Sequence, residues 1–409
     1  MRNVSIGEPI VIAQSTSEPI LFGGYQDPYI RCNAKGELFV RFNSRRDCHE
    51  TWGQEDHNPV YKSVDSGESW EILPDSLYSW ITAQKPLPNG DYLQMREHPI
   101  VTDLPALPEL PENRRNCSAI ANTHSVYRVD ELLPCLGNRV AKEFNAYRIK
   151  AGTREIEEEI CKVNWADMPL SLFQDSFIAR VFGGRYQADK NGVLWMPVHA
   201  PFITPNGELG SRRSCLHMLR SDDMGHTWDY VSTVAYREEY NDPKAIDVEG
   251  FSESTLEILD DGSLFCIMRS GSLHPFQPGD DEHPAPKLYC VKSTNGGKTW
   301  SEPTQFYDYG ILPVSVKMGC GVLIMASGRP GVYLRICDDP KAERWNDVIP
   351  ILSVPKEDIY KAYFEYSCSN TGLCAYDDHV AFLTYSNFQL TAPDGRRAKS
   401  ILVRKIVIE

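Results

Sequence analysis

The stretch Ser293-Thr-Asn-Gly-Gly-Lys-Thr-Trp300 occurs in this chain three times in one form. Ser63-Val-Asp-Ser-Gly-Glu-Ser-Trp70 and Ser221-Asp-Asp-Met-Gly-His-Thr-Trp228 share its pattern, Ser-x-Asp/Asn-x-Gly-x-Thr/Ser-Trp. The Asp or Asn can accept backbone N–H bonds, the Gly supplies a positive φ, and the Trp can fold back over the turn. An octapeptide that recurs at wide spacing indicates a repeat architecture, so we expect three copies of one hairpin turn.

Six other segments combine a turn centred on Gly or Asp with an apolar strand, which is the pattern of a β-hairpin. They are Lys35–Arg41, Asn89–Met95, Asn191–Met196, Asp261–Met268, Cys320–Met325 and Asp378–Thr384. If each hairpin joins the first and second strands of one sheet, the chain forms six blades. The last strand, Ser400–Val407, is expected to pair with Ile10–Ile12 and so to close the ring.

Composition narrows the class of protein. The net charge of −14 argues against nucleic acid or an anionic membrane as a partner. No apolar stretch approaches the roughly 18 residues of a membrane-spanning helix. The first residues lack the pattern of a signal peptide and the twelve Cys are scattered, so we expect a cytosolic protein with reduced thiols. No Cys or His spacing predicts a metal site, and no cofactor is expected.

Blades that share one axis form a single unit, so we expect one six-bladed propeller over residues 1–409. The interval from Gly90 to Gly192 is about twice the usual one, which predicts an insertion at about 99–180. Thr153–Ile160 could form a short helix there. The insertion could form a wall of the site or a homo-oligomer contact; the alternative is a solvated surface excursion.

Blade geometry selects candidate site residues, because first strands begin and second strands end at the same end of a propeller. Ahead of Gly36 and Gly262, the segments Gly24-Tyr-Gln-Asp27 and Gly250-Phe-Ser-Glu253 align residue for residue, which makes Asp27 and Glu253 equivalent. The sixth blade offers Tyr366 and Asn370. The ends of the second strands give Arg45, His98, His199, Arg269, Arg329 and Tyr385.

These residue types suit a sugar, most simply an acidic one. Arg binds a carboxylate in bidentate fashion. Two carboxylates can divide glycosidic cleavage between a proton donor and a base or nucleophile. Each residue also has a structural interpretation: Glu253 could only pair with Arg269, and a His at a strand end is often a satisfied polar residue.

The three octapeptides and the segment Glu253–Arg269 resemble the sialidase (neuraminidase) superfamily, whose Asp-box or BNR repeat has the form quoted above. The resemblance implies an all-β, six-bladed β-propeller with the boxes on outer hairpins. It also implies that Glu253 polarises a Tyr nucleophile. Arg269 and Arg329 would belong to a triad that grips the substrate carboxylate, and Arg45 would line the pocket.

Two positions depart from that family. Gln26 stands where the family has the first Arg of its triad, and the nucleophilic Tyr falls at Asn370. Tyr366 could replace it if a bulge precedes Asn370. The acid/base Asp of the family has loose matches only, at Asp47 or Asp56.

Our hypothesis is an exo-acting glycoside hydrolase for a terminal, acidic sugar. Asp27 and Glu253 would form the acidic pair, with Tyr366 as a further catalytic residue. The substrate would be bound by Arg269, Arg329, Arg45, His98 and His199. One alternative is a polysaccharide lyase acting on uronates through His98, His199 and Tyr366. The other is a non-catalytic carbohydrate-binding propeller.

Overall fold

The computed structural model describes residues 2–16, 24–45, 58–74, 76–96, 100–101, 110–112, 115–119, 122–137, 140–173, 177–179, 182–183, 185–237, 248–272, 286–355 and 365–409. The chain forms two compact units. Unit 1 covers Met1–Pro86 and Tyr309–Glu409, and unit 2 covers Leu87–Phe276 and Asp280–Asp308.

Among the described residues, unit 1 contains three antiparallel sheets. The first holds β3 (Gln26–Cys32), β4 (Leu38–Asn43), β5 (Val60–Ser63) and β6 (Glu71–Leu73), and α1 (Leu77–Thr82) follows it. The second holds β24 (Ile311–Lys317), β25 (Leu323–Gly328), β26 (Val332–Cys337) and β27 (Ile349–Leu352). The third holds β28 (Thr371–Ala375), β29 (Val380–Thr391), β30 (Arg397–Ile408), β1 (Val4–Ile6) and β2 (Ile10–Gln14).

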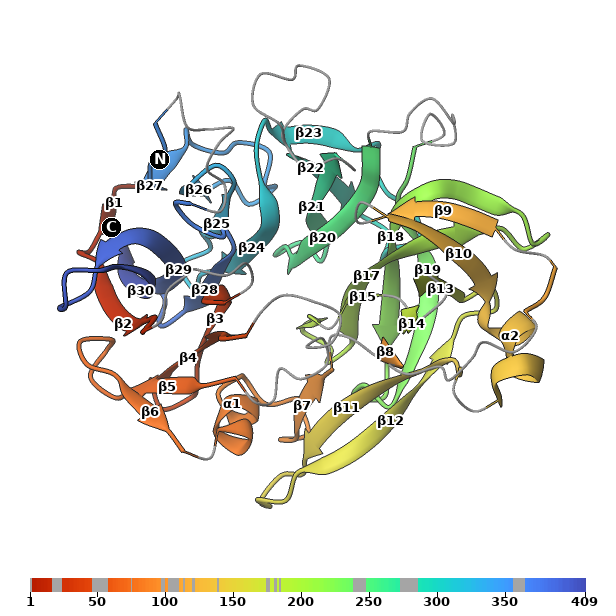
Figure 1. Cartoon of the computed structure of the whole chain (residues 1–409), viewed down its shortest axis with the longest axis horizontal. Helices are drawn as coiled ribbons and strands as arrows, with labels where there is room; N and C mark the ends of the chain where they lie inside the picture. The colour runs from red at the N-terminus through yellow and green to blue at the C-terminus, as the bar shows by residue number, and fades with distance from the viewer. Residues whose placement is uncertain are drawn as a thin grey trace. The chain divides into compact units, whose positions relative to one another are not determined.

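The third sheet joins the two ends of the chain. Strand β2 pairs with β30, with Ile10 opposite Val403 and Val11 opposite Leu402, and β1 pairs farther along β30. Figure 1 shows β2 and β30 side by side. The expected pairing of the first and last strands is therefore confirmed, and both edges of the C-terminal strand are covered.

The described part of unit 2 contains one extended network of strands and one separate sheet. The network holds β7 (Tyr92–Met95), β11 (Glu143–Ile149), β12 (Glu157–Asn164), β15 (Phe182–Gly183), β16 (Gln187–Ala188), β17 (Leu194–Ile203), β18 (Leu209–Ser221), β19 (Thr227–Ala235), β20 (Val248–Ile258), β21 (Leu264–Ser272), β22 (Lys287–Ser293) and β23 (Thr304–Tyr307). The separate sheet holds β8 (Ile100–Val101), β9 (Arg115–Ala119), β10 (Asn122–Arg128), β13 (Pro169–Phe173) and β14 (Phe177–Ala179), and α2 (Val129–Leu136) follows β10.

Two local predictions were wrong. The short helix considered over Thr153–Ile160 is absent: residues 153–156 form no helix, and β12 begins at Glu157, with Cys161 and Val163 buried between exposed neighbours. Alternation of this kind places one face of a strand on a core. The strand expected before Asn89 is also absent: α1 precedes that turn, and its residues Trp80 and Ile81 are buried. The other five predicted hairpins are confirmed.

The three octapeptides form the same turn, between β5 and β6, β18 and β19, and β22 and β23. In each, the first Ser hydroxyl accepts the Gly N–H and the Asp or Asn accepts the N–H four residues later; the first copy has these bonds at Ser63–Gly67 (2.9 Å) and Asp65–Ser69 (2.9 Å). The Gly has a positive φ of 87°, 89° or 73°. The turn therefore forms because side chains satisfy its backbone donors.

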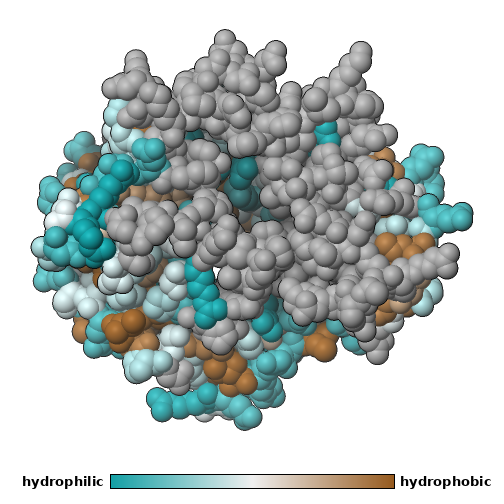
Figure 2. Space-filling model, in the orientation of Figure 1, coloured by the Kyte–Doolittle hydropathy of each residue, from teal (hydrophilic) through white to brown (hydrophobic). Residues whose placement is uncertain are grey.

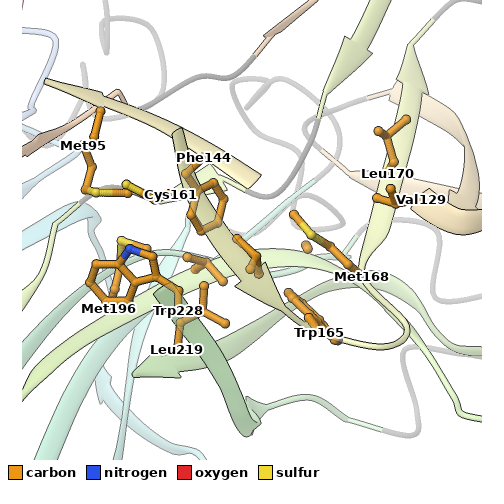
Figure 3. Packing of buried hydrophobic residues seen from close by; sticks show 14 of the residues in the cluster. Met95, Val129, Phe144, Cys161, Trp165, Met168, Leu170, Met196, Leu219 and Trp228 are labelled. Carbon is orange, nitrogen blue, oxygen red and sulfur yellow. The ribbon is translucent and has the colours of Figure 1, made fainter. Parts of the chain in front are cut away.

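The core of unit 2 packs around Trp228, the last residue of the second octapeptide. Its side chain is fully buried and belongs to one cluster with Met95, Phe144, Met196 and Leu219, as Figure 3 shows. A tryptophan of this size buries a large apolar area, so the octapeptide also anchors the core.

The described surface is mixed in character. On the face that Figure 2 shows, apolar residues lie in small groups between polar ones. Exposed large apolar side chains occur in both units, at Val11, Val64, Ile72, Leu133, Ile160 and Tyr236. Among the described residues, no helix has the length and apolar character that would cross a membrane.

Candidate active site

Three first strands contain a bulge at the same position. The registers of β3, β20 and β24 slip at Asp27, Glu253 and Leu312, whose φ angles are 48°, 24° and 35°. Non-glycine residues pay roughly 1–3 kcal/mol for such backbone angles. Because an apolar residue, Leu312, occupies one of these bulges, the bulge belongs to the fold and does not by itself indicate function. Asp27 and Glu253 differ from Leu312 in that each places a carboxylate at this position.

In unit 2, Glu253 forms an ion pair with Arg269 of the neighbouring strand β21. The guanidinium lies 2.8 Å from the carboxylate, and the side chains are 30% and 14% exposed. Because Ser252 lies opposite Arg269, the bulge turns Glu253 toward this arginine. The structure thus brings together the two residues whose spacing resembles the sialidase segment.

In unit 1, Asp27 receives a hydrogen bond from the side-chain amide of Asn370. The two residues precede or enter neighbouring strands, β3 and β28, which pack closely: a Cβ at Gly372 would lie 2.7 Å from the Pro28 carbonyl oxygen. Asn370, nine residues before His379, also matches the spacing of Asp27 and Gly36. The sequence analysis named both residues but did not predict their contact. Their shared spacing ahead of a hairpin turn could have suggested it.

Serine hydroxyls fix the segment that carries Asn370. The Ser386 hydroxyl accepts the Cys368 N–H at 3.0 Å, and Ser367 accepts the Ser369 N–H at 2.9 Å. Ser369 has a φ of 68°, so the backbone bends directly before Asn370, where a bulge was considered. Burial, and secondly the Asp27 carboxylate, raise the pKa of the Cys368 thiol to about 11.

The two arginines predicted in unit 1 lie at turns. Arg329 follows β25 with a φ of 67°, and its neighbour Gly328 lies against the sixth-blade segment, because a Cβ there would be 2.7 Å from the Ser369 carbonyl oxygen. Arg45 lies two residues beyond β4 and is exposed. Arg329 is therefore beside the Asn370 segment, whereas Arg45 stays a prediction.

His199 lies inside β17 rather than at its end, and it is partly buried. Its neighbour in space is His217 of β18, which the sequence analysis missed because apolar residues flank it on both sides. His217 is fully buried between Trp165 and Phe202 and contacts the Ala200 carbonyl and Thr233 hydroxyl. Burial lowers its pKa to about 4, so this histidine is neutral and structural.

The remaining predicted residues divide into two groups. Tyr366 is partly exposed, and its carbonyl accepts the Phe388 N–H at 2.8 Å; Tyr385 is buried within β29, where its hydroxyl accepts a bond from Arg404 at 3.1 Å. His98, Asp47 and Asp56 lie outside the described residues. Within the described ranges, no three His, Cys, Asp or Glu side chains gather in a way that would hold a metal ion.

Comparison with solved structures identifies the fold. A protein of unknown function from Dyadobacter fermentans DSM 18053 superposes with a TM-score of 0.64 at 16% identity, over 99% of each chain. The Hadza microbial sialidase Hz136 gives 0.52 at 12% identity, over 94% of this chain and 65% of that chain. An α-L-arabinanase from Penicillium chrysogenum, solved with arabinobiose, gives 0.52 at 12%, over 98% of each chain.

The chain has a sialidase-like β-propeller fold. The predicted fold class, an all-β six-bladed propeller, is thereby confirmed. No protein-family model matches the chain, and no curated protein matches it either. The named neighbours include glycoside hydrolases, but at these identities a likeness establishes the fold alone.

Proposed function

We propose that this protein is an exo-acting glycoside hydrolase that removes a terminal sugar, with Glu253 and Asp27 taking part in catalysis. The observation that carries the proposal is the partly buried Glu253–Arg269 ion pair. A partly buried ionisable group with a specific charged partner is a candidate for a functional site. The fold is also shared with a sialidase and an arabinanase.

The contacts define what each carboxylate can do. Arg269 favours the ionised form of Glu253, and the Asn370 amide favours the ionised form of Asp27. Both are therefore suited to act as base, nucleophile or charge stabiliser. The proton for the leaving group then comes from a third residue, and Asp47 and Asp56 stay the candidates from the sequence.

The proposal covers two kinds of terminal sugar, acidic and neutral. Arg329 and Arg45 support an acidic sugar, because a guanidinium binds a carboxylate in bidentate fashion. Two features support a neutral one: Arg269 is engaged by Glu253, and Gln26, which replaces the first Arg of the sialidase triad, is neutral and only 4% exposed. The substrate panel must therefore contain both kinds.

The test is turnover of a library of terminal glycosides, including sialosides, uronides and arabinosides. Hydrolysis by the wild type is expected, with Glu253→Gln and Asp27→Asn each reducing kcat by about 10²–10⁴-fold. Glu37→Gln is the matched control, because Glu37 pairs with Lys62 at the same 2.8 Å with similar exposure but lies beside a hairpin turn. Full activity in both site variants would remove the assignment.

A non-catalytic carbohydrate-binding propeller is the second candidate. The observation that favours it is that both carboxylates already have a partner within the protein. Binding of a library member without hydrolysis, and without an unsaturated product that absorbs in the ultraviolet, would support this function over hydrolase and lyase alike.

A further inference from the structure

Asn370 stands where the resemblance placed a nucleophilic tyrosine, and an amide cannot act as that nucleophile. Its side chain instead donates to the Asp27 carboxylate across the β3–β28 contact. Both residues come from unit 1 and from first strands at the same position before their hairpin turns. The bond therefore links corresponding positions of two neighbouring sheets.

Buried serine hydroxyls fix the backbone directly before Asn370. The Ser367 and Ser386 hydroxyls lie 3.1 Å apart, and each also accepts a backbone N–H of the segment, at Ser369 and Cys368 respectively. All four residues are buried. A donor on a backbone that is held in this way can fix the rotamer of the side chain that it contacts, here Asp27.

We propose that Asn370 is a positioning residue, which orients Asp27 and keeps it ionised for its role in catalysis. This inference rests on the proposed function. A hydrogen bond to a charged group is stronger than one between neutral groups, because the donor compensates the charge. Loss of the amide would leave the Asp27 carboxylate less well oriented and easier to protonate.

Other ionisable groups surround the same place and must be held constant in a test. The Cys368 thiol lies beside Asp27, and the Lys399 ammonium donates to the Gly24 carbonyl at 3.0 Å. Tyr25 is two residues before Asp27 and donates to the Gln14 carbonyl, and Arg329 adjoins the Ser369 segment. Burial lowers the pKa of Lys399. None of these groups is altered by a change at Asn370.

The experiment compares Asn370→Leu and Asn370→Asp with the wild-type full chain. Asn370→Leu removes the donor, so we expect kcat to fall roughly 10- to 100-fold with little change in KM. Asn370→Asp places a second carboxylate beside Asp27. The apparent pKa of the acid limb of the pH–rate profile should therefore rise by about one unit or more. Asn33→Asp is the control, because it adds the same charge immediately beyond the other end of β3.

Melting temperatures establish that each variant folds, and Asn370→Ser replaces the leucine variant if that one does not. An unchanged kcat and an unchanged acid limb in a folded Asn370 variant would overturn the proposal. An equal shift of the apparent pKa in Asn33→Asp would also overturn it, because the shift would then come from added negative charge at any position nearby.

A second readout separates this inference from the proposed function. The Asp27 carboxyl titration is followed by NMR in protein labelled with ¹³C-aspartate, with Asp27→Asn to assign the signal. A midpoint that rises in Asn370→Leu supports positioning even if the wild type hydrolyses nothing, which would refute only the proposed function. A midpoint that does not move refutes the role of Asn370.

Discussion

The Glu253 carboxylate and the Arg269 guanidinium lie 2.8 Å apart at the bulge of β20, and both side chains are partly buried. Arg269→Met would leave the carboxylate without this partner. We expect it to lower the free energy of unfolding by about 1–3 kcal/mol, less than for a fully buried pair because solvent screens the charge. Lys62→Met, which breaks the more ordinary Glu37 pair, should cost under about 1 kcal/mol. Urea unfolding measures both free energies. Equal losses in the two variants would contradict a larger contribution of the Glu253–Arg269 pair to stability.

The missing proton donor can be found by leaving-group dependence. If Asp47 or Asp56 supplies the proton, its Asn variant should hydrolyse activated aryl glycosides almost normally but lose about 10²–10⁴-fold on natural linkages. A uniform loss on both kinds of substrate would point to binding or folding instead. Steady-state kinetics with a series of aryl leaving groups gives the answer.

His217 makes the fold sensitive to acid. Its pKa of about 4 in the native protein lies below the ordinary value of about 6.5, so the unfolded chain binds the proton first. The contribution of His217 to the free energy of unfolding is constant above about pH 6.5. It falls as the pH drops from there to about 4, by up to roughly 3 kcal/mol in total. Measured between pH 7 and 4, unfolding of His217→Gln should show less pH dependence than the wild type. His379→Gln, at an exposed turn, is the control for the loss of a histidine elsewhere in the chain.

The octapeptide tryptophans should differ in their contribution to stability. Trp228 is fully buried among Met196 and Leu219, whereas Trp300 is partly exposed and bonds the Gly297 carbonyl. We expect Trp228→Ala to cost about 3–5 kcal/mol because it leaves a large cavity. Trp300→Ala should cost clearly less. Denaturant unfolding of the two variants would refute this ranking if their losses were equal.

Gly372 allows β28 to approach β3. A Cβ there would lie 2.7 Å from the Pro28 carbonyl oxygen and 2.9 Å from the Ile30 nitrogen, both backbone atoms that cannot move aside cheaply. Gly372→Ala should lower the melting temperature by several degrees and, by separating the strands, reduce turnover. Gly7→Ala is the control, since its nearest atom would be at 3.5 Å. A fully active Gly372→Ala would argue against a tight β3–β28 contact.

Sequence reasoning succeeded where local chemistry decides the structure. The octapeptide turns need only a hydroxyl, a carboxylate or amide, and a glycine at fixed spacing, so three of them could be located in advance. The pairing of Ile10 with the last strand followed from two apolar strand segments at the ends of the chain. The helix expected at Thr153–Ile160 failed because packing on a core overrides a run of helix-forming residues.

The sequence by itself determined the propeller class, because repeated turns and hairpins are encoded in short stretches whose backbone donors are satisfied locally. It also placed Asp27 and Glu253 at equivalent positions. Only the tertiary structure decided their partners: Asn370 lies 343 residues from Asp27 in the chain, and the bulge at Glu253 arises from strand register. Contacts between distant segments depend on how neighbouring sheets pack, and no local pattern records that.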